Sequence, residues 1–452
     1  MEIATRGEAE AVVERALRAA GTDEADASCV ITDRSLTRFA TSRIHQNLAE
    51  RSAVLTVRIV DGGRLGVAST SSLDDEAIRT AVALARELAR RSEPLPSFHG
   101  FHRTAPRAAA GAAWDEATAR VTPREKAETL RSMFRTGEAA GVRYAGAWST
   151  CAIGVAVGNV HGVRQAAPLT SAEIAVIALA DGGSGYATGR ARRARDLDPV
   201  ALADEAARKA TLLAGAGTTL EPGVYPVILE PPALAEIFEW MNTITFSGRS
   251  YEDGSSFFVG ALGERVLGEN FSLADDATDP SFLPFPFDME GLPKRRVDLI
   301  ERGVLRTPLL DKIAADRTGL PPTASAASLT GDDRGVALHL AMTAGDASVD
   351  DLIAGTERGI YVTRFHYLNG LLDPKVGMMT GMTRDGTFLV QDGRLAARLP
   401  NLRWTQAMTE ALANIEAIGR ERRIVGSFWN SLGGTLAPAV KIGAWRITGS
   451  TG

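Results

Sequence analysis

The chain has 452 residues, enough for two or three domains with substantial hydrophobic cores. Hydrophobic residues make up 45% and charged residues 23% of the sequence, which is typical of globular proteins. The formal net charge of -5 gives no overall attraction for nucleic acid or for an anionic membrane, so neither partner is predicted. No window of about 18 apolar residues is present, so no membrane-spanning helix is predicted either.

The cysteine content indicates a reducing compartment. Cys29 and Cys151 both lie in β-like runs, where a free cysteine is most often a small buried residue. Two cysteines are too few for a disulfide framework in a chain of this length. The N-terminal residues also lack the apolar segment of a signal peptide, so a cytoplasmic location is predicted.

The first half of the chain alternates helical and extended patterns. Helices are predicted over 9–20, 75–91, 123–141 and 199–213 from apolar periodicity and capping signals. The capping signals include a capping box from Thr122 to Glu125 and the Asp198-Pro199 pair. Extended segments are predicted over 28–47, as a hairpin over 53–70 that turns at Asp61-Gly62, and as a three-stranded meander over 143–180. The Gly-rich segment 182–189 is interpreted as a turn. This order predicts an N-terminal α+β domain, residues 1–215, with helices on an antiparallel sheet.

A Gly-rich segment at 215–223 is the predicted domain boundary. Beyond it, turn signals recur every 8 to 12 residues or so, a spacing typical of a curved antiparallel sheet. Residues 216–452 are therefore predicted to form a β-rich antiparallel domain of barrel-like or sandwich-like type. Within it, helices are predicted over 234–244, 311–318 and 404–418. Residues 376–383 and 387–390 are interpreted as two strands joined by a turn.

Signals for metal or nucleophilic chemistry are weak. The histidines are His45, His99, His102, His161, His339 and His366, and no HExxH pair occurs among them. The sequence also lacks the G-x-S-x-G motif of serine hydrolases. Cys151 could serve as a nucleophile only with a histidine nearby, and His161 on the following segment is the nearest candidate. A core cysteine is the favoured interpretation.

Polar residues gather in two parts of the second domain. One group follows the 234–244 helix and the other lies where a strand runs into a loop; together they include Arg249, Tyr251, Arg364, His366, Tyr367, Asn369 and Arg384. They are candidate substrate-binding residues. Alternating side chains on a strand also require one polar face in any β protein, so the sequence leaves a structural role equally open. A run of arginines at 190–195 is interpreted as a solvated or ion-paired surface.

Several motifs together resemble the TldD/TldE (PmbA, modulator of gyrase) family. They are SLTRFATSRIHQN at 35–47, FSGRSYEDGSSFFVGALGERV at 246–266, DMEGLPKRRVDLIERGVL at 288–305 and GIYVTRFHYLNGLLDPKVGMMTGMTRDGTFLVQDGRL at 359–395. The motifs occur in the family's order and extend over nearly the whole chain. The resemblance implies an N-terminal α+β domain, a C-terminal β-rich domain, and assembly as dimers.

The same resemblance implies that this chain is of the non-catalytic kind. Catalytic members carry HExxxH on the helix after the strand, and a later cysteine completes their zinc site. Here the histidine slots fall on Glu239 and Ile244 and the glutamate slot on Trp240, and no cysteine follows Cys151. This chain is therefore expected to bind no cofactor. Zinc is expected in an HExxxH-bearing partner, with which the chain would form a heterodimer acting on small or unfolded peptides.

Alternative functions remain open at this stage. The chain could form a homodimer when it is isolated, and its substrates could be peptide-like natural products. The degenerate site could serve in a metal-independent enzyme that hydrolyses or forms amide bonds, and this interpretation predicts a polar pocket around Glu239. A weaker alternative is a protein-binding modulator of gyrase or of a toxin-antitoxin system.

Overall fold

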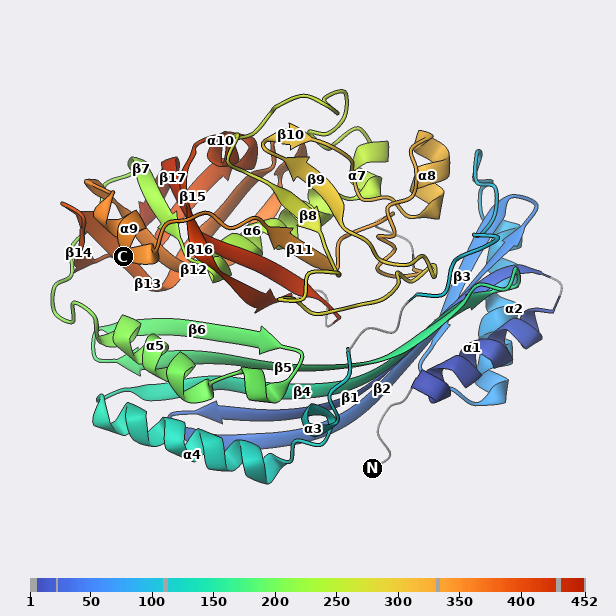
Figure 1. The fold of residues 1–452 in the computed structure, drawn as a ribbon, viewed down its shortest axis with the longest axis horizontal. Helices are drawn as coiled ribbons and strands as arrows, with labels where there is room; N and C mark the ends of the chain where they lie inside the picture. The colour runs from blue at the N-terminus through green and yellow to red at the C-terminus, as the bar shows by residue number, and fades with distance from the viewer. Residues whose placement is uncertain (1–5, 22, 109–112, 331–333, 428–431, 451–452) are drawn as a thin grey trace.

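The computed structural model describes residues 6–21, 23–108, 113–330, 334–427 and 432–450. These residues form two sheets that lie against each other, with helices on the outer face of the first (Figure 1). Among the described residues, no helix is both long and apolar enough to cross a membrane.

Sheet A is antiparallel and belongs to the N-terminal half. It has the strand order β3-β2-β1-β4-β5-β6. The strands are β1 (Glu24–Ala40), β2 (Arg43–Asp61), β3 (Arg64–Thr70), β4 (Arg143–Asn159), β5 (Arg164–Ala180) and β6 (Gly183–Ala191). Four of them exceed 15 residues, so the sheet is long and strongly curved, as Figure 1 shows. Thr41 and Ser42 adopt positive φ and turn β1 into β2.

Helices cover the convex face of sheet A. They are α1 (Arg6–Ala20), α2 (Asp75–Arg91), α4 (Pro123–Ala139) and α5 (Pro199–Thr211), with the short α3 (Glu116–Ala119) and the 3-10 turn η1 (Ala194–Asp196) between them. The predicted capping box is present: the Thr122 hydroxyl accepts the Glu125 N–H, and the Glu125 carboxylate accepts the Thr122 N–H. The α+β character of this half is confirmed.

Sheet B belongs to the C-terminal half and contains a closed ring. The strands β7 (Gly223–Leu229), β12 (Arg358–Asp373), β13 (Met378–Gln391), β15 (Leu402–Ala407) and β17 (Gly434–Ser450) pair in turn, and β17 pairs back onto β7. The other strands are β8 (Leu273–Asp275), β9 (Val297–Glu301), β10 (Val304–Leu305), β11 (His339–Met342), β14 (Arg394–Arg398) and β16 (Ile415–Gly426). The β7–β12 and β11–β17 pairings are parallel, so the sheet is mixed and not purely antiparallel as predicted.

The helices of the C-terminal half are α6 (Pro231–Ile244), α7 (Gly248–Glu252), α8 (Lys312–Thr318), α9 (Val349–Ala354) and α10 (Met408–Ala413), with the 3-10 turn η2 (Pro374–Val376). The predicted domain boundary at 215/216 lies between α5 and β7. Sheet A and sheet B are built from residues on either side of that boundary.

Three sequence predictions of local structure are wrong. Residues 404–418 form β15, α10 and β16, because pairing with β13 and β17 outweighs the local helical pattern. Residues 376–390 are mainly one strand, in which Asp385 and Gly386 adopt positive φ without reversing the chain. Residues 143–180 form two long strands, and the third strand is the segment 183–191, most of which the sequence pattern predicts as a turn. Its glycines are needed for packing: a Cβ at Gly185 would lie 2.2 Å from the Ala206 carbonyl oxygen of α5.

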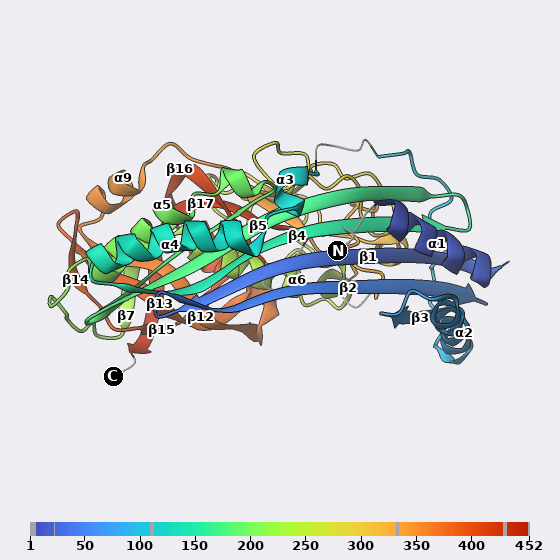
Figure 2. The same cartoon turned by 90° about the horizontal axis from the view of Figure 1, so that it is seen from below.

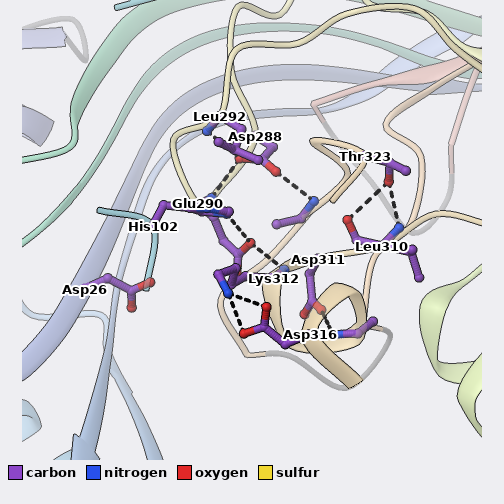
Figure 3. A network of polar contacts seen from close by, with 12 residues as sticks. Asp26, His102, Asp288, Glu290, Leu292, Leu310, Asp311, Lys312, Asp316 and Thr323 are labelled. Carbon is purple, nitrogen blue, oxygen red and sulfur yellow. Dashed lines mark hydrogen bonds and ion pairs between the residues drawn. The ribbon is translucent and has the colours of Figure 1, made fainter. Parts of the chain in front are cut away.

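A buried network of ion pairs joins sheet A to the C-terminal half. Figure 3 shows Asp26 and His102 on one side of this network and Glu290 and Lys312 on the other. Arg58 of β2 donates to Asp26 of β1 (Nε–Oδ1 3.0 Å) and to Glu290 Oε1 (2.9 Å). The second Glu290 oxygen accepts the backbone N–H of Lys312 at 2.8 Å, and His102 Nε2 lies 3.5 Å from it. Arg58 and Glu290 are both buried. The network therefore fixes the end of sheet A against the loop that precedes α8.

The pKa values of two carboxyl groups in this network are shifted in opposite directions. Burial raises the pKa of Asp311 to about 7, and the nearby Glu290 carboxylate adds to the rise. Burial also acts to raise the pKa of Glu290, but the charges and hydrogen bonds of Arg58 and His102 together outweigh it and lower this pKa to about 2. Glu290 therefore carries the negative charge near neutral pH, and Asp311 takes up a proton more readily than an exposed aspartate does.

Asp311→Asn is expected to flatten the pH dependence of stability between about pH 4 and 7. Because the folded-state pKa of Asp311 lies above its unfolded value, this group stabilises the fold fully below the unfolded pKa. The contribution is lost as the pH rises through about 7. The asparagine oxygen can still accept the Ala314 N–H, as Asp311 does at 2.7 Å. A tenfold difference in proton affinity between the folded and unfolded states corresponds to about 1.4 kcal/mol, so the variant should gain a few kcal/mol over the wild type across this range. Urea unfolding of the variant and the wild type at several pH values measures this difference in stability.

Asp74→Asn is the matched control. Asp74 caps α2 through the Ala77 N–H at 2.9 Å, and the Ser72 hydroxyl and that amide lower its pKa. Its contribution is present at neutral pH and lost as the pH falls, so the variant should change the slope in the opposite sense. Equal slopes for the wild type and Asp311→Asn would contradict the assignment of the pH dependence to Asp311.

Candidate functional site

The helix α6 lies at the centre of the candidate site. It begins directly after β7, with Glu230 as N-cap and Pro231 in its first turn. Glu230 is buried and accepts hydrogen bonds from Lys209 Nζ at 2.6 Å and from the Tyr361 hydroxyl at 2.5 Å. The N-terminus of α6 is therefore fixed by side chains from α5 and β12. The buried residues of the helix are Pro232, Ala233, Leu234, Ala235, Ile237, Phe238, Met241 and Ile244.

Two of the three degenerate motif positions pack against a hairpin. A Cβ at Gly370 of β12 would lie 2.7 Å from Ile244 Cδ1 and 2.9 Å from Trp240 Cε3. Trp240 is half-buried and Ile244 is buried in the main core of the C-terminal half. These two side chains therefore fill space between α6 and β12, and the glycine at 370 lets the strand approach them.

The third position, Glu239, faces a cavity of about 280 Å³. The Ser427 hydroxyl donates a hydrogen bond to its Oε1. One turn further along α6, the Asn242 carboxamide fixes the backbone of Ala337, with the amide and carbonyl contacts at 2.9 and 2.8 Å. The cavity lining includes Glu239, Asn242, Thr243, Ser328, Ser427 and Thr435, with Val30 of sheet A on the opposite side. The cavity lies where α6 faces the concave side of sheet A.

These residues do not fit a catalytic zinc site. Such a site needs three protein ligands that are nitrogen, oxygen or sulfur donors. The motif slots hold one carboxylate, one indole and one aliphatic side chain, and the carboxylate already accepts from Ser427. Within the described ranges, no three His, Cys, Asp or Glu side chains come together in a way that could hold a metal ion. No reaction step through a metal on this chain follows from this geometry.

A second carboxylate lies on the same side of α6. Burial raises the pKa of Glu236 to about 8; the Arg364 guanidinium opposes this rise and the Glu239 carboxylate adds to it. Glu236 is therefore largely protonated at neutral pH. A protonated carboxyl can donate as well as accept a hydrogen bond.

The candidate binding residues Arg364 and Arg384 lie together in the structure. They face each other in the β12–β13 register. Arg364 donates to Asp385 Oδ2 through Nε at 2.9 Å and through Nη2 at 2.5 Å, and its guanidinium stacks 4.4 Å from the ring centroid of Tyr186 on β6. Arg364 therefore bridges sheet B and sheet A. If Arg364 also contacts substrate, it does so while it holds Asp385 and Tyr186 in place.

His366, Tyr367 and Asn369 lie at the outer end of the β12–β13 hairpin and are all exposed. Tyr367 is 80% exposed and adopts a φ of 60°. Burial and the neighbouring Arg384 and Arg364 guanidinium groups lower the pKa of His366, so the imidazole is neutral at neutral pH. These three residues share one projecting surface.

Arg249 and Tyr251 lie apart from that surface. Both belong to α7, which packs against α8 in the upper right of Figure 1. Arg249 forms an ion pair with Asp253 at 2.8 Å, and Tyr251 is half-buried against the main core. The structure therefore places the candidate binding residues in two groups and does not bring them into one pocket.

The residues that line the cavity with Glu239 were not among the sequence candidates. Ser427, Asn242 and Thr435 come from three segments that are distant in sequence, and each is an ordinary polar residue in its own segment. The i, i+3 spacing of Glu236, Glu239 and Asn242 on a largely apolar helix is the sequence signal that could have indicated this side of α6.

The cysteines are unsuited to nucleophilic chemistry. Burial raises the pKa of the Cys29 thiol to about 12 and also raises that of Cys151. His161, which could have activated Cys151, instead has its Nε2 atom 2.8 Å from the carboxylate of Glu24. The interpretation of these residues as core cysteines agrees with this geometry.

Three arginines of the segment 190–195 form ion pairs: Arg190 with Glu173, Arg193 with Asp196 and Arg195 with Asp115.

The chain is similar to known proteins over most of its length. Models of the three PmbA/TldA metallopeptidase domains match residues 25–89 (domain 1), 116–214 (central domain) and 222–449 (C-terminal domain). A curated metalloprotease from Methanothermobacter thermautotrophicus is 29% identical over 38% of this chain and 37% of its own length. A zinc metalloprotease TldD homologue from Saccharolobus solfataricus is 26% identical over 52% of this chain and 53% of its own length. These matches thus span only about a third to a half of the relatives.

Solved structures confirm the fold. TldE from Thermococcus kodakarensis superposes with a TM-score of 0.86 at 19% identity, covering 97% of this chain and 100% of that one. A protein from Thermotoga maritima, described as a candidate modulator of a DNA gyrase, superposes with a TM-score of 0.81 at 20% identity, covering 97% and 100%. The C-terminal domain model alone spans half of the sequence. With the domain models in this order, the chain belongs to the PmbA/TldD family of metallopeptidase-related proteins.

Proposed function

We propose that this chain is a non-catalytic subunit of a heterodimeric zinc peptidase. Its partner is an HExxxH-bearing chain of the same fold, which holds the zinc, and the substrates are small or unfolded peptides or peptide-like natural products. The observation that carries the proposal is the state of α6. Trp240 and Ile244 pack against Gly370, so Glu239, which accepts from Ser427, is the one motif position with an oxygen donor, whereas a catalytic zinc site needs three protein ligands.

Co-expression with an HExxxH-bearing relative tests this proposal. The two chains are expected to copurify, with zinc present in the pair and absent from this chain purified alone. Peptide hydrolysis is expected only from the pair, or much faster from the pair than from the catalytic chain. Stoichiometric zinc on this chain alone, or full activity of the other chain without it, would overturn the proposal.

The exposed hairpin residues are expected to contribute to substrate contact within the pair. His366→Ala and Asn369→Ala should lower kcat/KM of the complex while leaving the stability of the chain nearly unchanged, because both side chains are exposed. Arg364→Ala should lower both kcat/KM of the complex and the stability of the chain, because it also removes the ion-pair partner of the buried Asp385. Peptidase assays and urea unfolding of each variant separate the two effects. Unchanged kcat/KM for all three variants would remove these residues from the substrate site.

The cavity beside Glu239 favours one second candidate, a metal-independent enzyme that hydrolyses or forms amide bonds. It holds a carboxylate, a hydroxyl that donates to it, and further polar side chains, in a space large enough for part of a small substrate. In this case the isolated chain would be active, and Glu239→Gln and Ser427→Ala would each abolish turnover. Activity of the isolated chain that both variants retain would exclude this cavity as the catalytic site.

A further inference from the structure

Two adjoining clefts lie along α5, where the N-terminal half meets the C-terminal half. The first has a volume of about 930 Å³ and is bounded by β6, η1, α5 and β16; the second has a volume of about 590 Å³ and is bounded by α5, α9, β12 and β16. Figure 1 shows α5 and β6 facing the strands of the C-terminal half. Both clefts are lined by Glu205, Arg208, Arg422 and Arg423, so together they form one groove, called here the α5 groove. A volume of about 300–1,000 Å³ is typical of small-molecule sites.

Ion pairs between the two halves fix one wall of the α5 groove. Arg423 of β16 donates to both carboxylate oxygens of Glu205 on α5, at 3.0 and 2.9 Å. Lys209 Nζ donates to Glu205 at 2.7 Å and to Glu230 at 2.6 Å, and Glu230 also accepts from the Tyr361 hydroxyl at 2.5 Å. The two cations and two carboxylates of this wall neutralise each other. The wall is therefore held in place by its own contacts and has no excess charge.

The first cleft has an excess of positive charge. Its lining contains six arginines and four carboxylates, in a chain whose formal net charge is -5. Two of the carboxylates are engaged: Asp196 accepts from Arg193 at 2.6 Å, and Asp198 accepts the Val200 N–H at 3.0 Å as the N-cap of α5. A cleft with this charge balance attracts anions.

Arg208 is a cation of this groove that the ion-paired wall does not neutralise. It is exposed and lines both clefts. Within the part of the chain that the structure describes, its guanidinium has no ion-pair partner, and neither has that of Arg192 in the first cleft; Asp204, one turn before Arg208, does not pair with it. The exposed acidic residues of the second cleft, Asp350 and Glu421, lie on α9 and β16. A ligand with one anionic group is therefore oriented with that group toward Arg208.

The second cleft also has an apolar wall. Val349 and Ile353 of α9, Phe388 of β13 and Leu395 of β14 line it, together with Leu212 at the end of α5. The first four belong to one hydrophobic cluster of the C-terminal half or pack against it. None of these side chains can form a hydrogen bond. A peptide backbone laid on this wall would lose hydration without gaining partners for its N–H and C=O groups, whereas a hydrocarbon would gain burial.

We propose that the α5 groove binds a small amphipathic carboxylate, a molecule with a hydrocarbon body and one anionic head. The head pairs with Arg208 where the two clefts adjoin, and the body covers the apolar wall of the second cleft. Because α5 and α9 belong to different halves of the chain, the bound molecule bridges the two halves. The groove shares no lining residue with the cavity beside Glu239, and the inference is independent of the proposed peptidase partnership.

Titration calorimetry with small probes tests the chemistry of the ligand. Octanoate should bind the wild-type chain about tenfold or more tightly than octanol, which lacks the charge, and than acetate, which lacks the hydrocarbon. No binding of octanoate, or equal binding of octanoate and either of the other probes, overturns the proposal. The peptide N-acetyl-leucyl-leucine carries the same carboxylate on a peptide body. If it binds more tightly than octanoate, the occupant is a peptide C-terminus and the proposed small molecule is wrong.

Substitutions on the two walls test where octanoate binds. Arg208→Gln should raise the Kd for octanoate about tenfold and leave the weak binding of octanol unchanged, because it removes only the charge. Ile353→Gln should weaken binding of both probes. Arg131→Gln is the matched control: Arg131 is an exposed arginine on α4 that lines neither cleft, so the Kd should stay at the wild-type value.

Amide hydrogen exchange gives an independent location for the bound probe. Octanoate should slow exchange in α5 and α9 of the wild-type chain and leave α1 and α2 unchanged, and this protection should be lost in Arg208→Gln. Equal losses of affinity in Arg208→Gln and Arg131→Gln, or protection confined to segments outside the α5 groove, would show that octanoate binds elsewhere and would overturn the proposed site.

Discussion

Arg58→Met is expected to destabilise the protein by about 3–5 kcal/mol, the cost of removing one partner from a buried ion pair. The substitution keeps an apolar stem of similar length but leaves the carboxylates of Asp26 and Glu290 without their shared cation. The guanidinium also lies 4.9 Å from the ring centroid of Phe101, and this contact would be lost. Because Asp26 and Glu290 belong to different halves of the chain, the variant should also loosen sheet A from the loop before α8.

Urea unfolding measures this effect, and limited proteolysis between the two halves reports the loosening. Arg91→Met is the matched control. Arg91 pairs with Glu87 at 2.6 Å on the surface of α2, so its loss should cost well under about 1 kcal/mol. A double-mutant cycle of Arg58→Met with Glu290→Gln should give a coupling of about 0.5–3 kcal/mol. Additive effects of the two substitutions would mean that the pair does not connect the two halves.

The sequence predicted much of the N-terminal half because its signals are local. The Thr122 capping box, the Asp-Gly turn at 61–62 and the Asp198-Pro199 helix start all depend on neighbours within four residues, and each is present in the structure. The prediction failed where long-range pairing decides. Trp404 lies in a helical pattern, yet it is fully buried between β13 and β17, and the ring of sheet B determines its conformation.

The candidate site was predictable only in part. The motif spacing located α6 and the three slots at Glu239, Trp240 and Ile244, and the structure gives each slot a contact. The sequence could not supply Ser427 or Asn242 as neighbours of the cavity, because sheet pairing of distant segments brings them there. It also could not show that Arg364 reaches across to Tyr186, since that contact depends on how sheet A lies over sheet B.

The HExxxH motif is absent from α6, and the packing around the helix also suits the residues that occupy its slots. Gly370 approaches Trp240 and Ile244 so closely that a Cβ would clash with both. In this packing an imidazole or carboxylate at either position would be placed among apolar neighbours. No cysteine follows Cys151 in the sequence, so a further ligand of the kind implied by the family resemblance is also missing. Reversing the loss therefore requires more than restoring the motif.

Restoring the motif by Glu239→His, Trp240→Glu and Ile244→His together is accordingly expected to fail. The triple variant should not retain stoichiometric zinc after dialysis, because two histidines of α6 supply fewer protein ligands than a catalytic site needs. It should also lose about 3–5 kcal/mol of stability. Ile244 is buried in the core, and Trp240 packs on it, so polar replacements lose apolar burial and leave polar groups without partners.

Elemental analysis of the dialysed protein and urea unfolding measure the two effects. Glu239→His alone is the control, because Glu239 is half-exposed and borders a polar cavity, and its stability should change by about 1 kcal/mol or less. The decisive comparison is between the single and triple variants. If packing around Gly370 is what excludes the metal site, the stability loss should appear only when positions 240 and 244 change. A triple variant that holds zinc stoichiometrically at wild-type stability would show instead that α6 had kept the capacity for a metal site, and the proposal of a non-catalytic subunit would lose its support.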